Sequence, residues 1–152
     1  MEESITSLSA FSDYFKNTLK LKEVDVKTYS PLALAYIGDG VYELIVRTKV
    51  MNHGSTQVHN MHKKSARLVN AGAQAEIIRR LLEDEDLTPE EVAVYKRGRN
   101  AKSVTTAKHA TVADYRTATG FEALCGYLYL NGSLDRLVTL IGKGLERIGE
   151  LE

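Results

Sequence analysis

The segment Pro31-Leu-Ala-Leu-Ala-Tyr-Ile-Gly-Asp-Gly-Val-Tyr-Glu-Leu-Ile-Val46 is apolar almost throughout, yet the acid Asp39 stands in it between two glycines. Ser30, directly before it, is a favourable N-cap, and proline suits the first position of a helix. We therefore predict a helix from Pro31 to about Met51. Because its first half is apolar nearly all round, this helix should lie at the centre of the core.

A second apolar segment, Gly120-Phe-Glu-Ala-Leu-Cys-Gly-Tyr-Leu-Tyr-Leu130, also carries one acid, Glu122. Acids are seldom buried unless they are paired, hydrogen-bonded or bound to a metal. Two such acids in distant parts of one chain suggest a shared site, which a divalent cation would hold together. The alternative for Asp39 is a buried acid that caps another helix or pairs with a distant arginine, and Glu122 carries the same ambiguity.

Gly38 and Gly40 flank Asp39, although glycine inside a helix costs about 1 kcal/mol relative to alanine. We interpret them as a sign that another backbone passes close by, or that Asp39 needs room. Glu43, four residues further on, shares the helix face of Asp39. Glu43 could be a second metal ligand, but we favour a solvated residue at the point where the helix emerges.

The remaining apolar patterns have helical spacing, and none alternates convincingly with a period of two. They predict further helices over residues 5–20, 57–83 with a bend near Ala71-Gly72, 89–97, 111–130 and 133–149. The ranges 20–29 and 98–110 are polar and should be irregular. We therefore expect an all-α protein, and the 152 residues fit one domain, 1–152, with a substantial core.

Composition excludes several classes of protein. Hydrophobic residues make up 43% of the chain and charged residues 26%, which are ordinary values for a globular protein. The single Cys125 excludes an intramolecular disulfide and any zinc site built from several cysteines. The N-terminus lacks the features of a signal peptide, and no apolar run is long enough to cross a bilayer, so we expect a cytoplasmic location.

The charges balance, with 20 Lys+Arg against 20 Asp+Glu, but they are unevenly distributed. No acid occurs between Val92 and Ala113, a span that holds five basic residues. Within it, Arg97-Gly-Arg-Asn-Ala-Lys-Ser103 is predicted to be a flexible basic loop, whose groups suit phosphate and 2′-hydroxyl contacts on an RNA helix. Lys63 and Arg67 would share one face of an earlier helix, for which the alternative is an ordinary solvated face.

These motifs resemble ribonuclease III. The run Tyr36-Ile37-Gly38-Asp39-Gly40-Val41 resembles the signature helix of that family, and Phe121-Glu122-Ala123-Leu124 with Gly126-Tyr-Leu-Tyr-Leu130 resembles its second acidic helix. The segments His62-Lys-Lys-Ser-Ala-Arg67 and Arg97 to Ser103 look like the Mini-ribonuclease III subfamily, which has a catalytic domain and no double-stranded-RNA-binding domain. The resemblance covers about Leu32 to Leu130, in the right order.

The resemblance implies an all-helical homodimer with the ribonuclease III endonuclease fold, which cleaves double-stranded RNA with Mg²⁺ and leaves 5′-phosphate ends. For Mini-ribonuclease III it implies maturation of the large-subunit (23S) ribosomal RNA precursor. Asp39 and Glu122 would be the catalytic residues that anchor Mg²⁺. The RNA contacts are expected from Lys63, Lys64, Arg67, Arg97, Arg99, Asn100, Lys102, Ser103 and Lys108.

Two positions depart from the family pattern. The family carries a glutamate where this chain has Ala35, and an aspartate where it has Thr119, so only Asp39 and Glu122 remain as ligands. Mg²⁺ keeps several waters and can be bound through one or two carboxylates plus substrate phosphate, so we expect weak metal binding until RNA arrives. The rival hypotheses are a protein that binds duplex RNA without cleaving it, and a helical interaction module without RNA affinity.

A homodimer is also expected because two sites related by a two-fold axis are the simplest way to cut both strands of a duplex. The tyrosines of the two apolar segments that carry Asp39 and Glu122 could form such an interface. For each of them, packing in the core is the alternative. They are Tyr36, Tyr42, Tyr127 and Tyr129.

Overall fold

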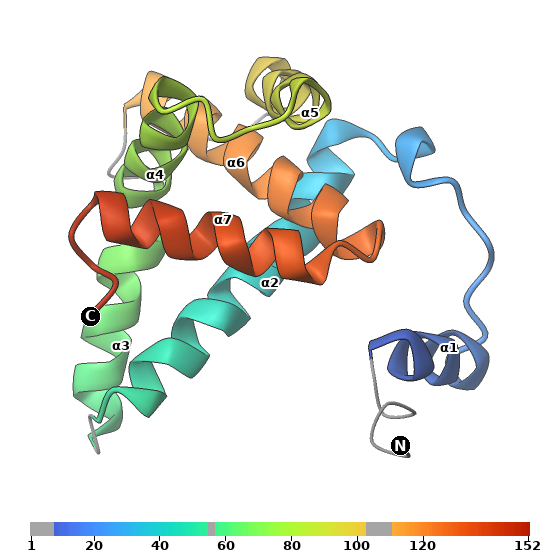
Figure 1. The fold of residues 1–152 in the computed structure, drawn as a ribbon, viewed down its shortest axis with the longest axis horizontal. Coiled ribbons are helices and arrows are strands. Elements are labelled where there is room, and N and C mark those ends of the chain that lie inside the picture. The colour runs from blue at the N-terminus through green and yellow to red at the C-terminus, as the bar shows by residue number, and fades with distance from the viewer. Residues whose placement is uncertain (1–7, 55–56, 103–110) are drawn as a thin grey trace.

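The computed structural model describes residues 8–54, 57–102 and 111–152, and within these ranges the chain forms helices and no strands (Figure 1). The predicted all-α class is therefore confirmed. None of the described helices combines the length and the apolar character that a membrane span requires. The elements are α1 (Leu8–Thr18), the one-turn 3₁₀ helix η2 (Val26–Thr28), α2 (Pro31–Asn52), α3 (Val58–Val69), α4 (Ala71–Glu83), α5 (Pro89–Asn100), α6 (Val112–Leu130) and α7 (Leu134–Arg147).

Helices α2 and α6 cross at the centre of the molecule, and α3, α4, α5 and α7 pack around them. α3 packs on α2, α4 and α7 pack on α6 and on each other, and α5 lies against both α6 and α2. Figure 1 shows α1 to one side of this bundle, joined to it by an extended connection. The expectation that the helix from Pro31 is central to the core is confirmed.

The aromatic pair Tyr42 and Phe121 joins α2 and α6 inside the core. Both side chains are fully buried, and their rings meet edge to face with centroids 5.3 Å apart. The Tyr42 hydroxyl donates a hydrogen bond of 2.8 Å to the carbonyl of Leu68, so this buried phenol is satisfied by the end of α3. Around the pair lie the buried aliphatic side chains Val46, Ile77, Ile78, Leu81, Leu124, Leu137, Leu140 and Ile141.

Helix starts and stops mostly follow the capping residues in the sequence. The Ser30 hydroxyl accepts from the Ala33 N–H, and Thr111 accepts from Asp114. Gly54 and Gly132 adopt φ values of +100° and +77° after α2 and α6, which is the left-handed conformation that glycine adopts at helix ends.

The single helix predicted over 57–83, with a bend near Ala71-Gly72, is in fact two helices, α3 and α4, which are separated at Asn70. The Asn70 backbone is extended, with φ −71° and ψ 160°. Its side-chain oxygen accepts from the Ala73 N–H, while its amide nitrogen donates to the carbonyls of Ala66 and Arg67 at 3.0 Å. The Asn70 side chain thus ends α3 and starts α4. The helical spacing of apolar residues continues across this position, so it does not reveal the break.

The predicted basic loop over Arg97 to Ser103 is also wrong in part, because α5 continues to Asn100. Gly98 allows this continuation against α6, since a Cβ at this position would come within 2.7 Å of the Ala123 Cβ. Arg97, Arg99 and Asn100 therefore lie in the last helical turn. Ser103 lies outside the described residues.

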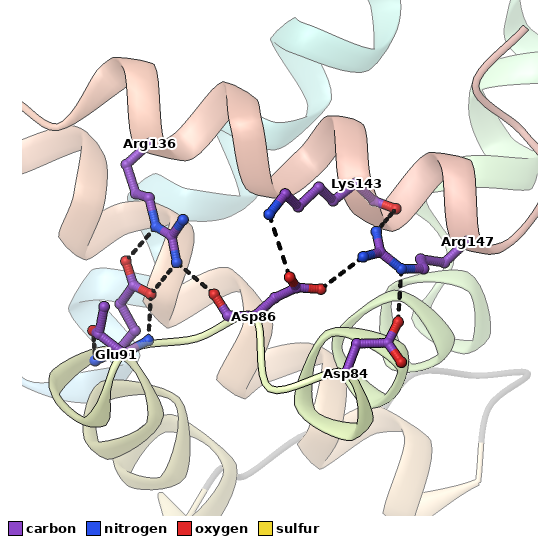
Figure 2. A network of polar contacts seen from close by, with 7 residues as sticks. Asp84, Asp86, Glu91, Arg136, Lys143 and Arg147 are labelled. Atoms are coloured by element: carbon purple, nitrogen blue, oxygen red, sulfur yellow. Dashed lines mark hydrogen bonds and ion pairs between the residues drawn. The ribbon is translucent and has the colours of Figure 1, made fainter.

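An ionic cluster fixes the connection between α4 and α5 onto α7 (Figure 2). Arg136 makes two hydrogen bonds to the Glu91 carboxylate, of 2.8 and 2.9 Å, and a third to the carbonyl of Asp86. Lys143 and Arg147 bind the Asp86 carboxylate at 3.3 and 3.0 Å. The acids Asp86 and Glu91 therefore hold this connection and the start of α5 against α7.

Candidate functional site

Two reciprocal glycines bring α2 and α6 into backbone contact. A Cβ at Gly38 would overlap the carbonyl oxygen of Glu122 and approach the Gly126 nitrogen to 2.7 Å. A Cβ at Gly126 would in turn overlap the carbonyl oxygen of Leu34. The expectation that another backbone passes close to Gly38 is confirmed, whereas Gly40 faces open space.

This crossing brings the two sequence-predicted acids together. Asp39 is exposed rather than buried, while Glu122 is half-buried beside it. Burial raises the pKa of Glu122 to about 8, and the charge of Asp39 and a hydrogen bond between the two carboxyl groups add to the effect. Two carboxyl groups this close, one of them with a raised pKa, form a site where a cation would compete with the proton of Glu122.

Gln74, in the first turn of α4, is a third polar group at this crossing. Its side chain is only 2% exposed, and a hydrogen bond from it to Glu122 partly offsets the rise in the pKa of that acid. We did not single out Gln74 from the sequence. The available signal was a polar residue on the face of 71–83 that otherwise buries Ile77, Ile78 and Leu81.

The two positions that depart from the ribonuclease III pattern supply no carboxylate. Ala35 and Thr119 are both buried, and the Thr119 hydroxyl donates to the Tyr115 carbonyl of its own helix at 2.9 Å. In the described part of the chain, no group of three or more His, Cys, Asp or Glu side chains is arranged to hold a metal. Glu43 pairs with Arg47 on the helix surface, in agreement with the solvated interpretation.

The sequence-predicted RNA contacts lie in two groups. On α3, Lys63, Lys64 and Arg67 are exposed, and Arg67 also pairs with Glu150 at 3.1 Å. The second group, at the end of α5, consists of Arg97, Arg99, Asn100 and Lys102. Because α3 packs on α2, and α5 on both α2 and α6, each group is attached to the helices that carry the acids. Ser103 and Lys108 lie outside the described residues.

Arg99 makes two side-chain contacts at the end of α5. Its guanidinium lies over the ring of Tyr95, 5.6 Å from the centroid, and its Nε donates to the Asn100 side chain at 3.1 Å. The Tyr95 ring is itself buried against Gly120 of α6. These contacts orient the Arg99 side chain at the end of α5.

The tyrosines divide between core and surface. Tyr42 and Tyr127 are buried, so packing in the core is the interpretation that holds for them. Tyr129 is partly buried against the core, while Tyr36 is 84% exposed. Tyr36 belongs to a series of exposed apolar side chains along α2, together with Leu32, Leu44 and Met51.

Comparison with known proteins gives a consistent match. Residues 32–133 match the model of the Ribonuclease III domain. The chain is 46% identical to a Mini-ribonuclease 3 of Enterococcus faecalis over 126 residues, which cover 83% of this chain and 96% of that protein. It is 44% identical to a Mini-ribonuclease 3 of a Thermoanaerobacter species over 137 residues, which cover 90% of this chain and 95% of that protein.

A solved structure has the same fold. The crystal structure of a protein from Fusobacterium nucleatum superposes with a TM-score of 0.71 at 30% sequence identity. The superposition covers 78% of this chain and 95% of that protein.

Proposed function

Because the chain belongs to the ribonuclease III family and is an endoribonuclease, we propose that it cleaves double-stranded RNA with Mg²⁺ held by Asp39 and Glu122. The main support is the meeting of these two acids, 83 positions apart in the sequence, at the crossing of α2 and α6. The proposed natural substrate is the precursor of 23S ribosomal RNA, and the proposed products have 5′-phosphate ends.

The donor set fits a hard cation. Mg²⁺ prefers carboxylate and water oxygens and is commonly bound by one or two carboxylates together with substrate phosphate. Burial, and then the nearby charge of Asp39, raise the pKa of Glu122, and a bound cation would offset both by stabilising the charged carboxylate. When bound, Mg²⁺ supplies Lewis acidity to the scissile phosphate and lowers the pKa of a water nucleophile.

The protein's own groups would hold both the cation and the duplex. Asp39 is exposed and faces solvent, where phosphate can reach it, whereas Glu122 is fixed in the wall of the crossing. Cations on α3, in the last turn of α5 and in the residues that follow α5 in the sequence would neutralise backbone phosphates, contacts that carry no sequence information. We assign this role to Lys63, Lys64, Arg67, Arg97, Arg99, Lys102 and Lys108, with Asn100 and Ser103 as hydrogen-bonding groups.

We also propose that the active form is a homodimer in the cytoplasm. The exposed apolar residues along α2, which include Tyr36 at 84% and Leu44 at 66% exposure, offer a surface that a second copy could cover. Asp39 lies on the same helix, so such an interface would place two sites next to each other. Sedimentation that gives only a monomer at working concentration would contradict the dimer.

The test is cleavage of a labelled RNA duplex with Mg²⁺ and with a chelator. The unchanged protein should cut only with the metal, and Asp39→Asn and Glu122→Gln should each abolish cutting while still binding the duplex. Glu43→Gln is the matched control, because Glu43 is an acid of the same helix that pairs with Arg47 and should be dispensable. Full activity in either acid variant contradicts the assignment.

One observation favours a second candidate, a protein that binds duplex RNA without cleaving it. Ala35 and Thr119 are buried and supply no carboxylate, which leaves fewer ligands than the family pattern implies. Metal-independent duplex binding with no cleavage under any divalent cation would establish this alternative.

A further inference from the structure

The Gln74 carboxamide is the least exposed polar side chain at the crossing of α2 and α6. It extends from the first turn of α4, which packs on α6, and is 2% exposed. Its Nε2 donates a hydrogen bond of 2.8 Å to the carbonyl of Val69, the last residue of α3. The same side chain hydrogen-bonds Glu122, so it links the end of α3 to the acid on α6.

Part of this arrangement has a structural explanation. The last four carbonyls of an α-helix lack partners within the helix. In α3 all four are satisfied by side chains: those of Ala66 and Arg67 by Asn70, that of Leu68 by Tyr42, and that of Val69 by Gln74. This role uses one of the two Nε2 hydrogens of Gln74 and leaves the second hydrogen and the oxygen free for other partners.

The oxygen of the carboxamide is not explained by the fold. Oε1 of Gln74 is buried and has no hydrogen-bond partner among the residues that the structure describes. An unpartnered buried acceptor is costly, and in a native protein it usually meets an ordered water or an ion. Here it belongs to a side chain that already contacts a proposed metal ligand.

We propose that Gln74 is a positioning residue of the metal site: its amide nitrogen holds the Glu122 carboxylate in place, and its oxygen accepts a hydrogen bond from a water bound to the cation. This inference rests on the proposed function. It supplies a third polar group in a site where Ala35 and Thr119 provide no carboxylate. Partners of this kind that orient a ligand typically change metal affinity or activity by 10- to 100-fold.

The test is Gln74→Met, which keeps the side-chain volume and removes both polar groups. Mn²⁺ binding to the RNA-free protein is measured by water-proton relaxation, and duplex cleavage is measured separately. We expect the Kd for Mn²⁺ to rise roughly tenfold and kcat to fall by a similar factor. The KM for the duplex should change little, because the variant keeps every group that binds phosphate.

Asn70→Ala is the matched control for a purely structural effect. Asn70 also binds the end of α3 and caps α4, but it is not among the groups that shift the pKa of Glu122. It should lower the melting temperature while leaving the Kd for Mn²⁺ unchanged. A Kd within about twofold of the parent value in folded Gln74→Met overturns the inference.

The unchanged protein provides a second measurement that does not depend on the variant folding. The side-chain amide resonances of Gln74 should broaden when Mn²⁺ is added, and Asp39→Asn should suppress the broadening. Resonances that stay sharp while the protein demonstrably binds Mn²⁺ overturn the inference alone. A parent protein that neither binds Mn²⁺ nor cleaves the duplex overturns the proposed function, and this inference with it.

Discussion

Gly38 of α2 lies directly against the carbonyl group of Glu122 in α6, with no room for a methyl group between the two helices. The neighbouring residue, Asp39, thereby meets the side chain of Glu122. Fold and site thus depend on the same contact, because the approach that packs the two central helices also pairs the two acids.

This contact predicts that Gly38→Ala is severely destabilising. The new methyl would overlap a backbone carbonyl, which cannot move like a flexible side chain, so we expect a loss of about 3 kcal/mol in the free energy of unfolding. Gly40→Ala is the control, because its Cβ would face open space, and alanine favours a helix by about 1 kcal/mol. Urea unfolding of both variants checks this, and equal stability of the two would contradict the packing described.

A second prediction concerns the raised pKa of Glu122 beside Asp39. The pKa of Glu122 is raised from 4.5 to about 8, so its contribution to stability is fully present below pH 4.5 and is lost as the pH rises through 8. The metal-free protein should therefore melt at a lower temperature at pH 8.5 than at pH 5, and Mg²⁺ should stabilise it more at pH 8.5. Glu122→Gln should remove this pH dependence; an unchanged dependence in that variant would show that other groups cause it.

A third prediction concerns the ion pair between Glu91 and Arg136, which joins α5 to α7. Glu91 is 5% exposed, so removing its partner leaves a charge poorly solvated, and Arg136→Met should cost about 2 kcal/mol or more. The control is Arg80→Gln, which breaks the exposed pair with Glu76 and should cost less than about 0.5 kcal/mol. Chemical unfolding compares the two, and equal losses would rule out a special role for the Arg136 pair.

The same pair predicts sensitivity to acid. Burial raises the pKa of Glu91, but hydrogen bonds from Arg136 and Thr88 and the charge of Arg136 outweigh it, so the pKa is lowered overall. A lowered pKa contributes stability that is present above the unfolded value, near 4.5, and is lost as the pH falls below it. Melting curves between pH 6 and 3 should show this loss in the parent protein and a smaller loss in Glu91→Gln. Parallel curves for the two proteins would contradict it.

A fifth prediction separates RNA binding from chemistry. Lys63→Gln with Lys64→Gln should weaken duplex binding and reduce the dependence of log K on log salt by about 0.7 to 0.9 for each phosphate that is no longer neutralised. Single-turnover cleavage of bound duplex should be nearly unchanged, because neither lysine is at the acid pair. The control is Lys22→Gln, an exposed lysine outside α3 and α5. Salt titrations check this; the same weakening in the control would mean that only net charge matters.

Much of the fold could be predicted because apolar spacing and capping residues are local signals. Ser30, Thr88 and Thr111 start helices through hydrogen bonds to residues three positions away, and these are visible in the sequence. The continuation of α5 through Gly98 depends on α6, which is distant in sequence. Local propensity therefore suggested a loop where tertiary packing maintains a helix.

The pairing of the two acids could be predicted from the sequence, but the groups around them could not. Asp39 and Glu122 stand out because they interrupt apolar segments, and the resemblance to ribonuclease III relates them to each other. Gln74 does not stand out, because one glutamine on an apolar helix face has many ordinary explanations. Only the three-dimensional arrangement shows that it contacts Glu122 and that its oxygen is unpartnered in the described structure.

The most direct measurement is the single-turnover rate of duplex RNA cleavage by the unchanged protein and by Glu122→Gln, at saturating Mg²⁺ and with equal fractions of duplex bound. If Glu122 and Asp39 hold the catalytic cation, the variant should be slower by about a hundredfold or more, since losing a ligand should cost at least as much as losing a group that orients one. Rates that agree within about twofold would contradict this assignment, because the acid would then contribute neither to metal binding nor to the chemical step.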